Sequence, residues 1–556
     1  MPVARLSRHL VPFALLLLVA GPLLWAVGST VPFGMQAPAW AALLQHPQTW
    51  PALGMTIWTG LSATLLATGI TACILARWLA PTGTAQGLDK WARWMSPLLS
   101  VPHAAFAIGM VALLAPGGWL LRLISPWPSG LESPPAWATT QDPWGLGLIA
   151  VLVLKEVPFL LWAALAYVQQ PGVQAQLRQS LRLAATWGYS DAQAWWRIGW
   201  PQLVRHLTAP LLAVLAYSLT VVDMALVIGP TAPPTLSVLA WQWLQDADPA
   251  INAQGASAAW LLAAVLLGCA GALVAWRAWP LWRQRQVRGV TLAQYSITVR
   301  KPDAVSAPLA ALLGVYVAVL AALATGSVSG PWPFPALLPE VWTLHAWEGV
   351  LRSSRTVWIT LGLGLLSAAT ALAWVVAWLE WAPLGWQRRM RPVWMLPLVL
   401  PAVLWVVGLH RLSLAWGLDG QAAGLWLAHT LSALPYVLIA LQGPYGGVDP
   451  RLLQVSAALG RSRAAFLWQV KWPLLRSALA AALAVGFAVS VAQYLPTLYV
   501  GAGRFQTVTT EAVTLASGGQ RALTAAFAWL QWLLPMLMFG LAAWSGRPRR
   551  WPAAAQ

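Results

Sequence analysis

Long apolar stretches alternate with short polar segments along the whole of this 556-residue chain. A bilayer core about 30 Å thick requires roughly 20 mostly apolar residues in a helix that crosses it. Windows of this length predict membrane-spanning helices at 10–27, 53–76, 95–115, 146–168, 207–229, 258–276, 307–326, 356–379, 393–410, 422–441, 475–500 and 523–543. The pattern therefore indicates an all-α polytopic membrane protein with about 12 transmembrane helices.

The composition excludes a water-soluble globular protein. Hydrophobic residues make up 59% of the chain and charged residues only 9%, whereas soluble domains carry about 25% charged residues. The two cysteines, Cys73 and Cys269, both lie in apolar stretches and cannot form a disulfide framework or a cysteine metal cluster. Because the first apolar stretch is longer than the core of a signal peptide, we expect it to be an uncleaved first helix.

Basic residues are distributed unevenly between the two sides of the predicted membrane. With a cytoplasmic N-terminus, 26 of the 33 Lys and Arg fall in inner segments and six in outer ones, while Lys155 lies within a span. Cytoplasmic segments are enriched in Lys and Arg, so we expect a multi-pass membrane protein with both termini in the cytoplasm. This asymmetry also accounts for the net charge of +18 without a nucleic-acid partner.

Sequence motifs recur between the two halves of the chain. Early in each half, Thr56, Trp58 and Leu61 recur as Thr356, Trp358 and Leu361, and later Gly188, Pro201 and Ser218 recur as Gly460, Pro473 and Ser490. We define the repeat offset as the interval in sequence from Gly188 to Gly460. We interpret the chain as two lobes of six helices each, residues 1–290 and 307–556, joined by a cytoplasmic linker at 291–306. Because six is an even number, the lobes are expected to be parallel repeats with a solute passage along their common axis.

The longest inner segment of each lobe has the same spacing. Residues 182–201 and 454–473, the first and second modules, place a glycine at the same interval before a proline, Gly188 before Pro201 and Gly460 before Pro473. The glycines permit the left-handed turn that ends a helix. We expect a second short helix in each module, which ends before the proline and leaves aromatic and basic side chains on the surface.

Serines occupy the predicted start of each second helix. Ser190 and Ser462 lie at N-cap positions, and Gln193 completes a capping box in the first module only. Such a helix is typical of docking into a groove on a partner protein, or of resting on the lipid surface. Two copies with identical spacing favour a partner that is itself twofold.

These modules resemble the EAA loops of the permease subunits of binding-protein-dependent ABC importers, in which E-A-A-x-x-x-G precedes a proline at a similar interval. The glutamate of that motif is replaced by Arg182 in the first module and by Gln454 in the second. The two-lobed chain resembles the fused permeases of the thiamine, ferric-iron and YnjC-type group over nearly its whole length, and residues 492–499 resemble the YnjC type in particular. The ATPase-coupling residues that the resemblance implies are Ala184, Gly188, Ser190, Trp195, Pro201, Gly460, Ser462, Phe466 and Pro473.

The resemblance also implies a MetI-like permease fold, a location in the bacterial inner membrane and a division of labour between proteins. This chain would form the solute pathway and work by alternating access, a cytoplasmic ABC ATPase dimer would bind ATP and Mg²⁺, and a periplasmic or extracellular protein would deliver the solute. None of the four lysines lies in a P-loop motif, and we expect no cofactor, metal site, catalytic residue or enzymatic activity on this chain. The solute stays open between thiamine-like molecules, ferric iron, polyamines and oxyanions.

Ionisable residues within the spans are candidates for the solute pathway, because charge in a bilayer normally faces protein or water. Lys155 and Glu156 lie near the middle of 146–168, and Asp223 lies in 207–229. Lys155 and Asp223 are interpreted as an interhelical pair or as solute contacts. The second lobe offers polar side chains instead, at Gln493, Tyr494, Thr497 and Tyr499.

The main alternative is a proton- or ion-coupled secondary transporter, which also contains two six-helix repeats. Such a transporter does not require paired glycine-turn modules before the fifth and eleventh helices. A membrane-embedded enzyme is disfavoured because the sequence has no recognisable catalytic triad, metal cluster or pair of catalytic carboxylates.

Overall fold

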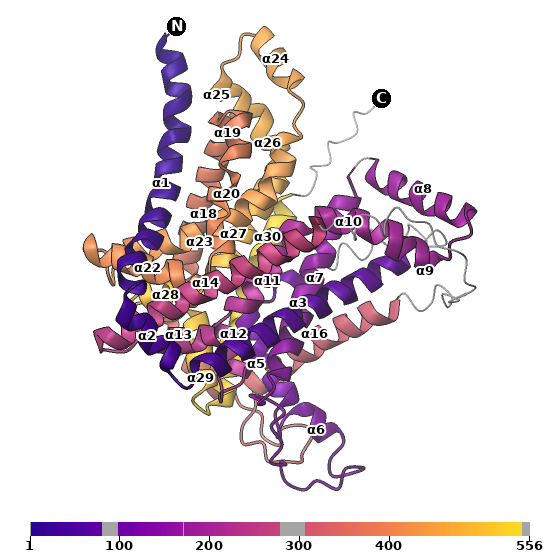
Figure 1. The fold of residues 1–556 in the computed structure, drawn as a ribbon, viewed down its shortest axis with the longest axis vertical. Helices are drawn as coiled ribbons and strands as arrows, with labels where there is room; N and C mark the ends of the chain where they lie inside the picture. The colour runs from indigo at the N-terminus through magenta and orange to yellow at the C-terminus, as the bar shows by residue number, and fades with distance from the viewer. Residues whose placement is uncertain (1, 80–97, 171, 279–305, 547–556) are drawn as a thin grey trace. The chain divides into compact units, whose positions relative to one another are not determined.

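The structure is a computed structural model that describes residues 2–79, 98–170, 172–278 and 306–546. Within these ranges the chain is helical, apart from turns, loops and one isolated antiparallel bridge between Ser329 and Trp342 (Figure 1). The all-α prediction is confirmed. The predicted linker at 291–306 lies outside the described residues except for Ser306.

The helices form two compact units. The N-terminal unit contains the described residues of Phe33–His345 together with Gly519–Ala526. Its helices are α2 (Ala37–Gln45), α3 (Thr49–Leu79), α5 (His103–Leu114), α6 (Trp119–Leu123), α7 (Leu146–Val168), α8 (Val173–Thr186), α9 (Asp191–Ala194), α10 (Trp200–His206), α11 (Thr208–Thr220), α12 (Asp223–Ile228), α13 (Leu236–Leu244), α14 (Pro249–Ala278) and α16 (Ser306–Ser327).

The C-terminal unit contains the described residues up to Pro32, Ala346–Gly518 and those from Phe527 onwards. Its helices are α1 (Pro2–Gly34), α17 (His345–Arg352), α18 (Ser354–Trp381), α19 (Leu384–Arg389), α20 (Arg391–Trp394), α21 (Leu396–Val399), α22 (Ala402–Ala415), α23 (Ala422–Gly446), α24 (Arg451–Ala458), α25 (Arg463–Phe466), α26 (Trp472–Leu474), α27 (Arg476–Val491), α28 (Leu495–Val500), α29 (Val508–Ala516) and α30 (Arg521–Ser545).

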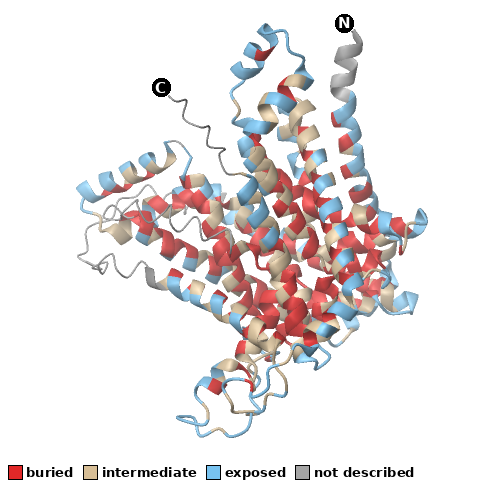
Figure 2. Cartoon of the chain, turned by 180° about the vertical axis from the view of Figure 1, so that it is seen from behind, coloured by how far each residue is buried: buried red, intermediate tan, exposed pale blue. Residues whose placement is uncertain are grey.

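Each unit is built around three long helices that pack against one another: α3, α7 and α11 in the N-terminal unit, and α18, α23 and α27 in the C-terminal unit. Small residues allow the close approach. A Cβ atom at Gly60 would lie 2.6 Å from Leu219, and one at Gly364 would lie 2.8 Å from the ring of Phe487. Figure 2 shows buried residues where the long helices pack and exposed residues on their outward faces.

The first helix of each sequence half belongs to the unit that contains the other half. In the C-terminal unit, α1 packs so closely on α22 that a Cβ atom at Gly408 would overlap the backbone of Ala26. In the N-terminal unit, α16 packs on α5, with the rings of Phe106 and Tyr316 4.6 Å apart. The compact units therefore do not follow the predicted lobe boundaries at these two helices, and the lobes remain a description of the sequence repeat.

Nine helices in the described ranges are long and apolar enough to cross a membrane, or eleven if each of two bent helix pairs is one span. A shorter apolar helix, α22, has 14 residues and overlaps the predicted span at 393–410. These helices agree with the prediction of a polytopic membrane protein.

Several predicted spans are not continuous helices: 393–410 is divided among α20, α21 and α22, and two others break at matching places. The segment 207–229 divides into α11 and α12 at Val221 and Val222, and 475–500 divides into α27 and α28 at residues 492–494. A break frees backbone carbonyls, which need new partners in a membrane. The hydroxyl of Ser237 donates to the carbonyl of Val221 at 2.8 Å, and Thr509, the counterpart of Ser237 by the repeat offset, donates to that of Val491.

A second repeated contact corrects the sequence alignment of the halves. The amide of Leu236 donates to the hydroxyl of Thr56 at 2.7 Å, and the amide of Val508 donates to that of Thr360 at 2.9 Å. Leu236 and Val508 are themselves related by the repeat offset. Thr56 therefore has its structural counterpart in Thr360, one helical turn beyond the predicted Thr356.

The segment 117–144, between α5 and α7, is held by a buried arginine. Arg122 is 4% exposed, and its guanidinium donates to the carbonyls of Gly117, Trp332 and Pro333. It also lies 4.5 Å from the ring centroid of Trp332. The arginine thus fastens this segment to the chain that follows α16.

Candidate functional site

The first module forms the predicted helix, glycine turn and helix. α8 ends in a Schellman motif, in which the amide of Tyr189 donates to the carbonyl of Ala184 at 3.2 Å and that of Gly188 donates to Ala185 at 3.0 Å. Gly188 has a φ of +83°, the left-handed conformation that favours glycine. The predicted turn is confirmed.

The N-cap of the next helix is also as predicted. The hydroxyl of Ser190 accepts a hydrogen bond from the amide of Gln193 at 3.3 Å, and the Gln193 side chain accepts one from the Ser190 amide at 3.0 Å. This reciprocal pair is a capping box. It fixes the direction in which α9 leaves the turn.

The second module repeats this geometry in the other unit. The amide of Arg461 donates to Ser456 at 3.0 Å and that of Gly460 donates to Ala457 at 2.9 Å, with a Gly460 φ of +71°. Ser462 caps α25 by accepting from the amide of Ala465 at 3.2 Å. The capping box is absent from this module because alanine stands where the first module has glutamine.

One prediction for the modules is wrong: neither second helix ends before its proline. A π-helical turn at Trp195–Gly199 leads into α10, and one at Leu467–Lys471 leads into α26. Pro201 and Pro473 lie in the first turns of α10 and α26, where a missing amide hydrogen is tolerated. The wider π-helical turn before each proline lets the chain continue as a helix.

The bend comes after the proline instead. The helical segment Asp191–His206 meets α11 at 73°, and Arg463–Leu474 meets α27 at 77°. Each module is therefore joined directly to one of the three central helices of its unit. A displacement of the module acts on that helix through a very short connection.

Some predicted coupling residues hold the module together, whereas others lie on its surface. Ala184, Trp195 and Phe466 are buried. By the repeat offset, Trp195 corresponds to Leu467, and Phe466 corresponds to Ala194. The two buried aromatic side chains therefore occupy different positions in the two modules.

The exposed face of each module contains the positions at which the EAA glutamate is replaced. Neither Arg182 in the first module nor Gln454 in the second is buried. The residue before each glycine is a large apolar side chain that is mostly exposed: Trp187 at 74% and Leu459 at 72%. Such exposed apolar side chains at matching places are typical of a binding surface.

Glu380 forms a buried ionic cluster with the second module that the sequence analysis did not identify. Its side chain is 7% exposed and forms ion pairs at 2.7 Å with both Arg463 and Lys471. The hydroxyl of Tyr445 donates to the same carboxylate at 2.9 Å. The sequence offered one signal for this cluster: a single acidic residue at the end of an apolar span, together with two cations in the second module.

The pathway candidates of the first half do not form the suggested pair. Lys155 donates to the carbonyl of Val101 at 2.6 Å, and among the described ion pairs there is none between Lys155 and Asp223. Lys155 and Glu156 are buried in the middle of α7. Asp223 begins α12, directly after the break in the fifth predicted span.

The pathway candidates of the second half surround the break between α27 and α28. Gln493 and Tyr494 lie in the break, Thr497 is buried in α28, and Tyr499 is 8% exposed. His429, fully buried on α23, was not predicted as a site residue. Its Nδ1 is 2.8 Å from the hydroxyl of Ser490, and its Nε2 is 2.9 Å from that of Thr497, so it bridges the two sides of the break.

Comparison with curated proteins gives three informative similarities. The chain is 34% identical over 552 residues to the inner membrane ABC transporter permease protein YnjC of Escherichia coli (strain K12), covering 97% of each chain. It is 26% identical to the thiamine transport system permease protein ThiP of the same organism, over 84% of each chain. A segment of 129 residues, 21% of this chain and 49% of the relative, is 34% identical to the molybdenum transport system permease protein ModB of Mycobacterium tuberculosis. No protein-family model matches the chain.

Proposed function

The chain belongs to the permease subunits of ABC transporters, and from this premise we propose that its first and second modules each dock one subunit of a separate ATPase dimer. It is a multi-pass inner-membrane transport subunit of an importer rather than an enzyme. In this proposal both termini are cytoplasmic, ATP and Mg²⁺ bind to the partner ATPase, and a solute-binding protein delivers the solute on the opposite side.

The observation that supports this proposal is the repetition of one complete structural unit. Both modules contain a Schellman turn, a serine N-cap, a π-helical turn, a proline in the next helix and a bend of 73° or 77° into a central helix. They are related by the repeat offset in sequence and lie in different compact units. A repeated, exposed module joined to a spanning helix is suited to transmit movement from a twofold partner.

The docking contact would rely on shape and apolar burial more than on the acidic residue of the EAA motif. Arg182 and Gln454 replace that residue, so neither module can form an ion pair with a cation of the ATPase at this position. Trp187 and Leu459 instead offer exposed apolar surface next to the glycine turns. Tryptophan is enriched among the residues that contribute most to the stability of such interfaces, and burial of a leucine side chain adds hydrophobic stabilisation.

The solute pathway is proposed to follow the two broken helices. Each break places irregular backbone within a unit, and in membrane proteins such backbone lies within protein or lines a water-filled cavity. The candidate contacts are Lys155, Glu156, Asp223, Gln493, Tyr494, Thr497 and Tyr499. The names of the relatives give two different cargoes, thiamine and molybdenum, so they do not select one solute for this chain.

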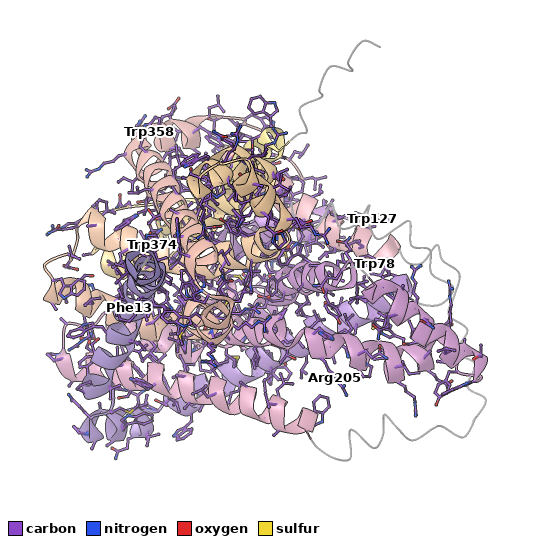
Figure 3. All side chains as sticks on the ribbon, turned by 90° about the horizontal axis from the view of Figure 1, so that it is seen from above. Phe13, Trp78, Trp127, Arg205, Trp358 and Trp374 are labelled. Carbon is purple, nitrogen blue, oxygen red and sulfur yellow. The ribbon has the colours of Figure 1, made fainter. Side chains whose placement is uncertain are left out.

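Co-purification with the ATPase tests the docking proposal. Trp187→Asp and Leu459→Asp place a charge on the exposed apolar surface of one module each, and neither should disturb the buried core. We expect each variant to reach the membrane in normal amount and to lose most of the bound ATPase. Trp127→Asp is the matched control and should retain the bound ATPase. Trp127 is 84% exposed and lies in the segment 117–144, away from both modules in sequence (Figure 3). Retention of the ATPase by both module variants would contradict the proposal.

A further inference from the structure

The carboxylate of Glu380 connects two points of the second module, Arg463 and Lys471, to α18. Its Oε1 accepts from Arg463 Nη2 at 2.7 Å and from Nε at 3.2 Å, and its Oε2 accepts from Lys471 Nζ at 2.7 Å. Arg463 also donates to the backbone carbonyl of Glu380 at 3.0 Å. Arg463 is the first residue of α25, and Lys471 is the last residue of the π-helical turn. One side chain therefore holds the helical segment Arg463–Leu474 at its first residue and again before its last turn.

A third helix joins the same cluster. Tyr445, near the end of α23, donates to Glu380 at 2.9 Å, and Lys471 Nζ lies 4.0 Å from the centroid of the tyrosine ring. The indole of Trp472 lies 3.5 Å from the tyrosine hydroxyl. The cluster thus joins α18 and α23, two of the three central helices of the unit, to the module.

The charges are sheltered from solvent to different degrees. The exposed fractions of the side chains are 7% for Glu380, 15% for Lys471 and 41% for Arg463. Ion pairs on the surface contribute little because water and salt screen them. Partly buried, charge-assisted hydrogen bonds to one carboxylate hold a defined geometry more strongly, and an unpaired charge at this position would be costly.

The first module is fastened differently. By the repeat offset, Arg463 corresponds to Asp191 and Lys471 corresponds to Gly199, so the two cations have no counterpart at these positions. A Cβ atom at Gly199 would lie 2.7 Å from the ring of Trp195 and 3.2 Å from Leu181. At these two positions the first module has no cation, and Gly199 is closely packed within the module.

We propose that Glu380 is a positioning residue, which makes the second module move as one body with the ends of α18 and α23 when the ATPase changes state. This inference rests on the proposed docking of the ATPase. The carboxylate does not contact the partner; it acts through Arg463 and Lys471. The second module would then drive three central helices, whereas its direct chain connection reaches only α27.

Distances between spin labels in the full complex with its ATPase test this role without knowledge of the solute. Cys73 and Cys269 are first replaced by serine, and labels are placed by Leu384→Cys and Leu474→Cys. These two side chains are 71% and 60% exposed, on α19 just after α18 and at the end of the helical segment Arg463–Leu474 of the second module. The distance distribution is measured without nucleotide and with Mg-ATP and vanadate.

With Glu380 present, we expect one narrow distribution that is the same in both nucleotide states. Glu380→Gln is expected to retain the bound ATPase but to give a distribution that broadens or shifts with nucleotide. Glu348→Gln, which alters an exposed ion pair with Arg352 at 3.7 Å, is the matched control and should behave like the parent. If Glu380→Gln does not accumulate, Glu380→Asp, which keeps the charge but shortens its reach, is expected to show the same nucleotide dependence.

Three results would overturn the positioning role: a parent distance that changes with nucleotide, a Glu380 variant as rigid as the parent, or loss of the ATPase from the Glu380→Gln complex. The last result would make Glu380 part of the docking surface. Failure of the parent complex itself to hold an ATPase would instead refute the proposed function. The two failures are therefore distinguishable.

Discussion

Gly460 offers a direct test of the glycine turn in the second module. Its φ of +71° is a conformation that side-chain-bearing residues rarely adopt, and a Cβ atom added to this glycine would have no heavy atom within 4 Å. Gly460→Ala therefore introduces backbone strain without a steric clash. Any loss of function in this variant reports on the shape of the turn.

The expected magnitude follows from the backbone conformation. A left-handed conformation costs an L-residue about 1–2 kcal/mol. This cost lowers the equilibrium constant for forming the turn roughly 5- to 30-fold, and the apparent dissociation constant for the ATPase rises by up to the same factor. Gly460→Asn should lose less affinity because asparagine tolerates this conformation. Gly460→Val should lose more because its side chain is β-branched.

Titration of the purified permease with the ATPase measures this change. Gly443→Ala is the matched control, since Gly443 lies within α23 and a Cβ atom added there would also have no heavy atom within 4 Å. It adds the same methyl group in an ordinary helical conformation, where alanine is preferred. Equal affinities for the Gly460→Ala and Gly443→Ala variants would refute the reasoning.

Four further substitutions have expected outcomes. Ser190→Ala and Ser462→Ala each remove an N-cap at a cost of about 1 kcal/mol. Limited proteolysis should cleave the first module of Ser190→Ala faster than the second module of Ser462→Ala, because only the first module loses a capping box. Cleavage as slow as in the parent protein would count against the caps. Gly408→Ala places a methyl group against the backbone of Ala26, so we expect little folded protein by size-exclusion chromatography, and a normal yield would show that α1 does not pack there. His429→Leu breaks two buried hydrogen bonds and should lower stability by about 1–3 kcal/mol in thermal unfolding; an unchanged melting temperature would contradict the bridging role.

The local features of the modules were predictable because they depend on residues close together in sequence. A glycine at a helix end and a serine shortly after it specify the turn and the N-cap without help from the rest of the fold. The apolar stretches specified the spanning helices for the same reason. The continuation of each helix through Pro201 and Pro473 was not predictable, because it depends on a π-helical turn that has no simple sequence signal.

Long-range contacts could not be inferred from the pattern. Lys155 and Asp223 were paired on charge alone, but Lys155 instead donates to a backbone carbonyl, that of Val101. The exchange of α1 and α16 between the units depends on which apolar faces meet, and lipid-facing and protein-facing residues have similar composition. Glu380 was overlooked because Arg463 and Lys471 are distant from it in sequence.

Site-specific photo-crosslinking tests the central claim that each module contacts an ATPase subunit. A photoreactive residue replaces Trp196 or Trp468, which are 46% and 70% exposed on the two modules, or Trp358, which is 70% exposed on α18 (Figure 3). After illumination of the intact complex, we predict crosslinks to the ATPase from both module positions and none from Trp358. A complex that holds the ATPase yet gives no crosslink from one of the modules would contradict the claim.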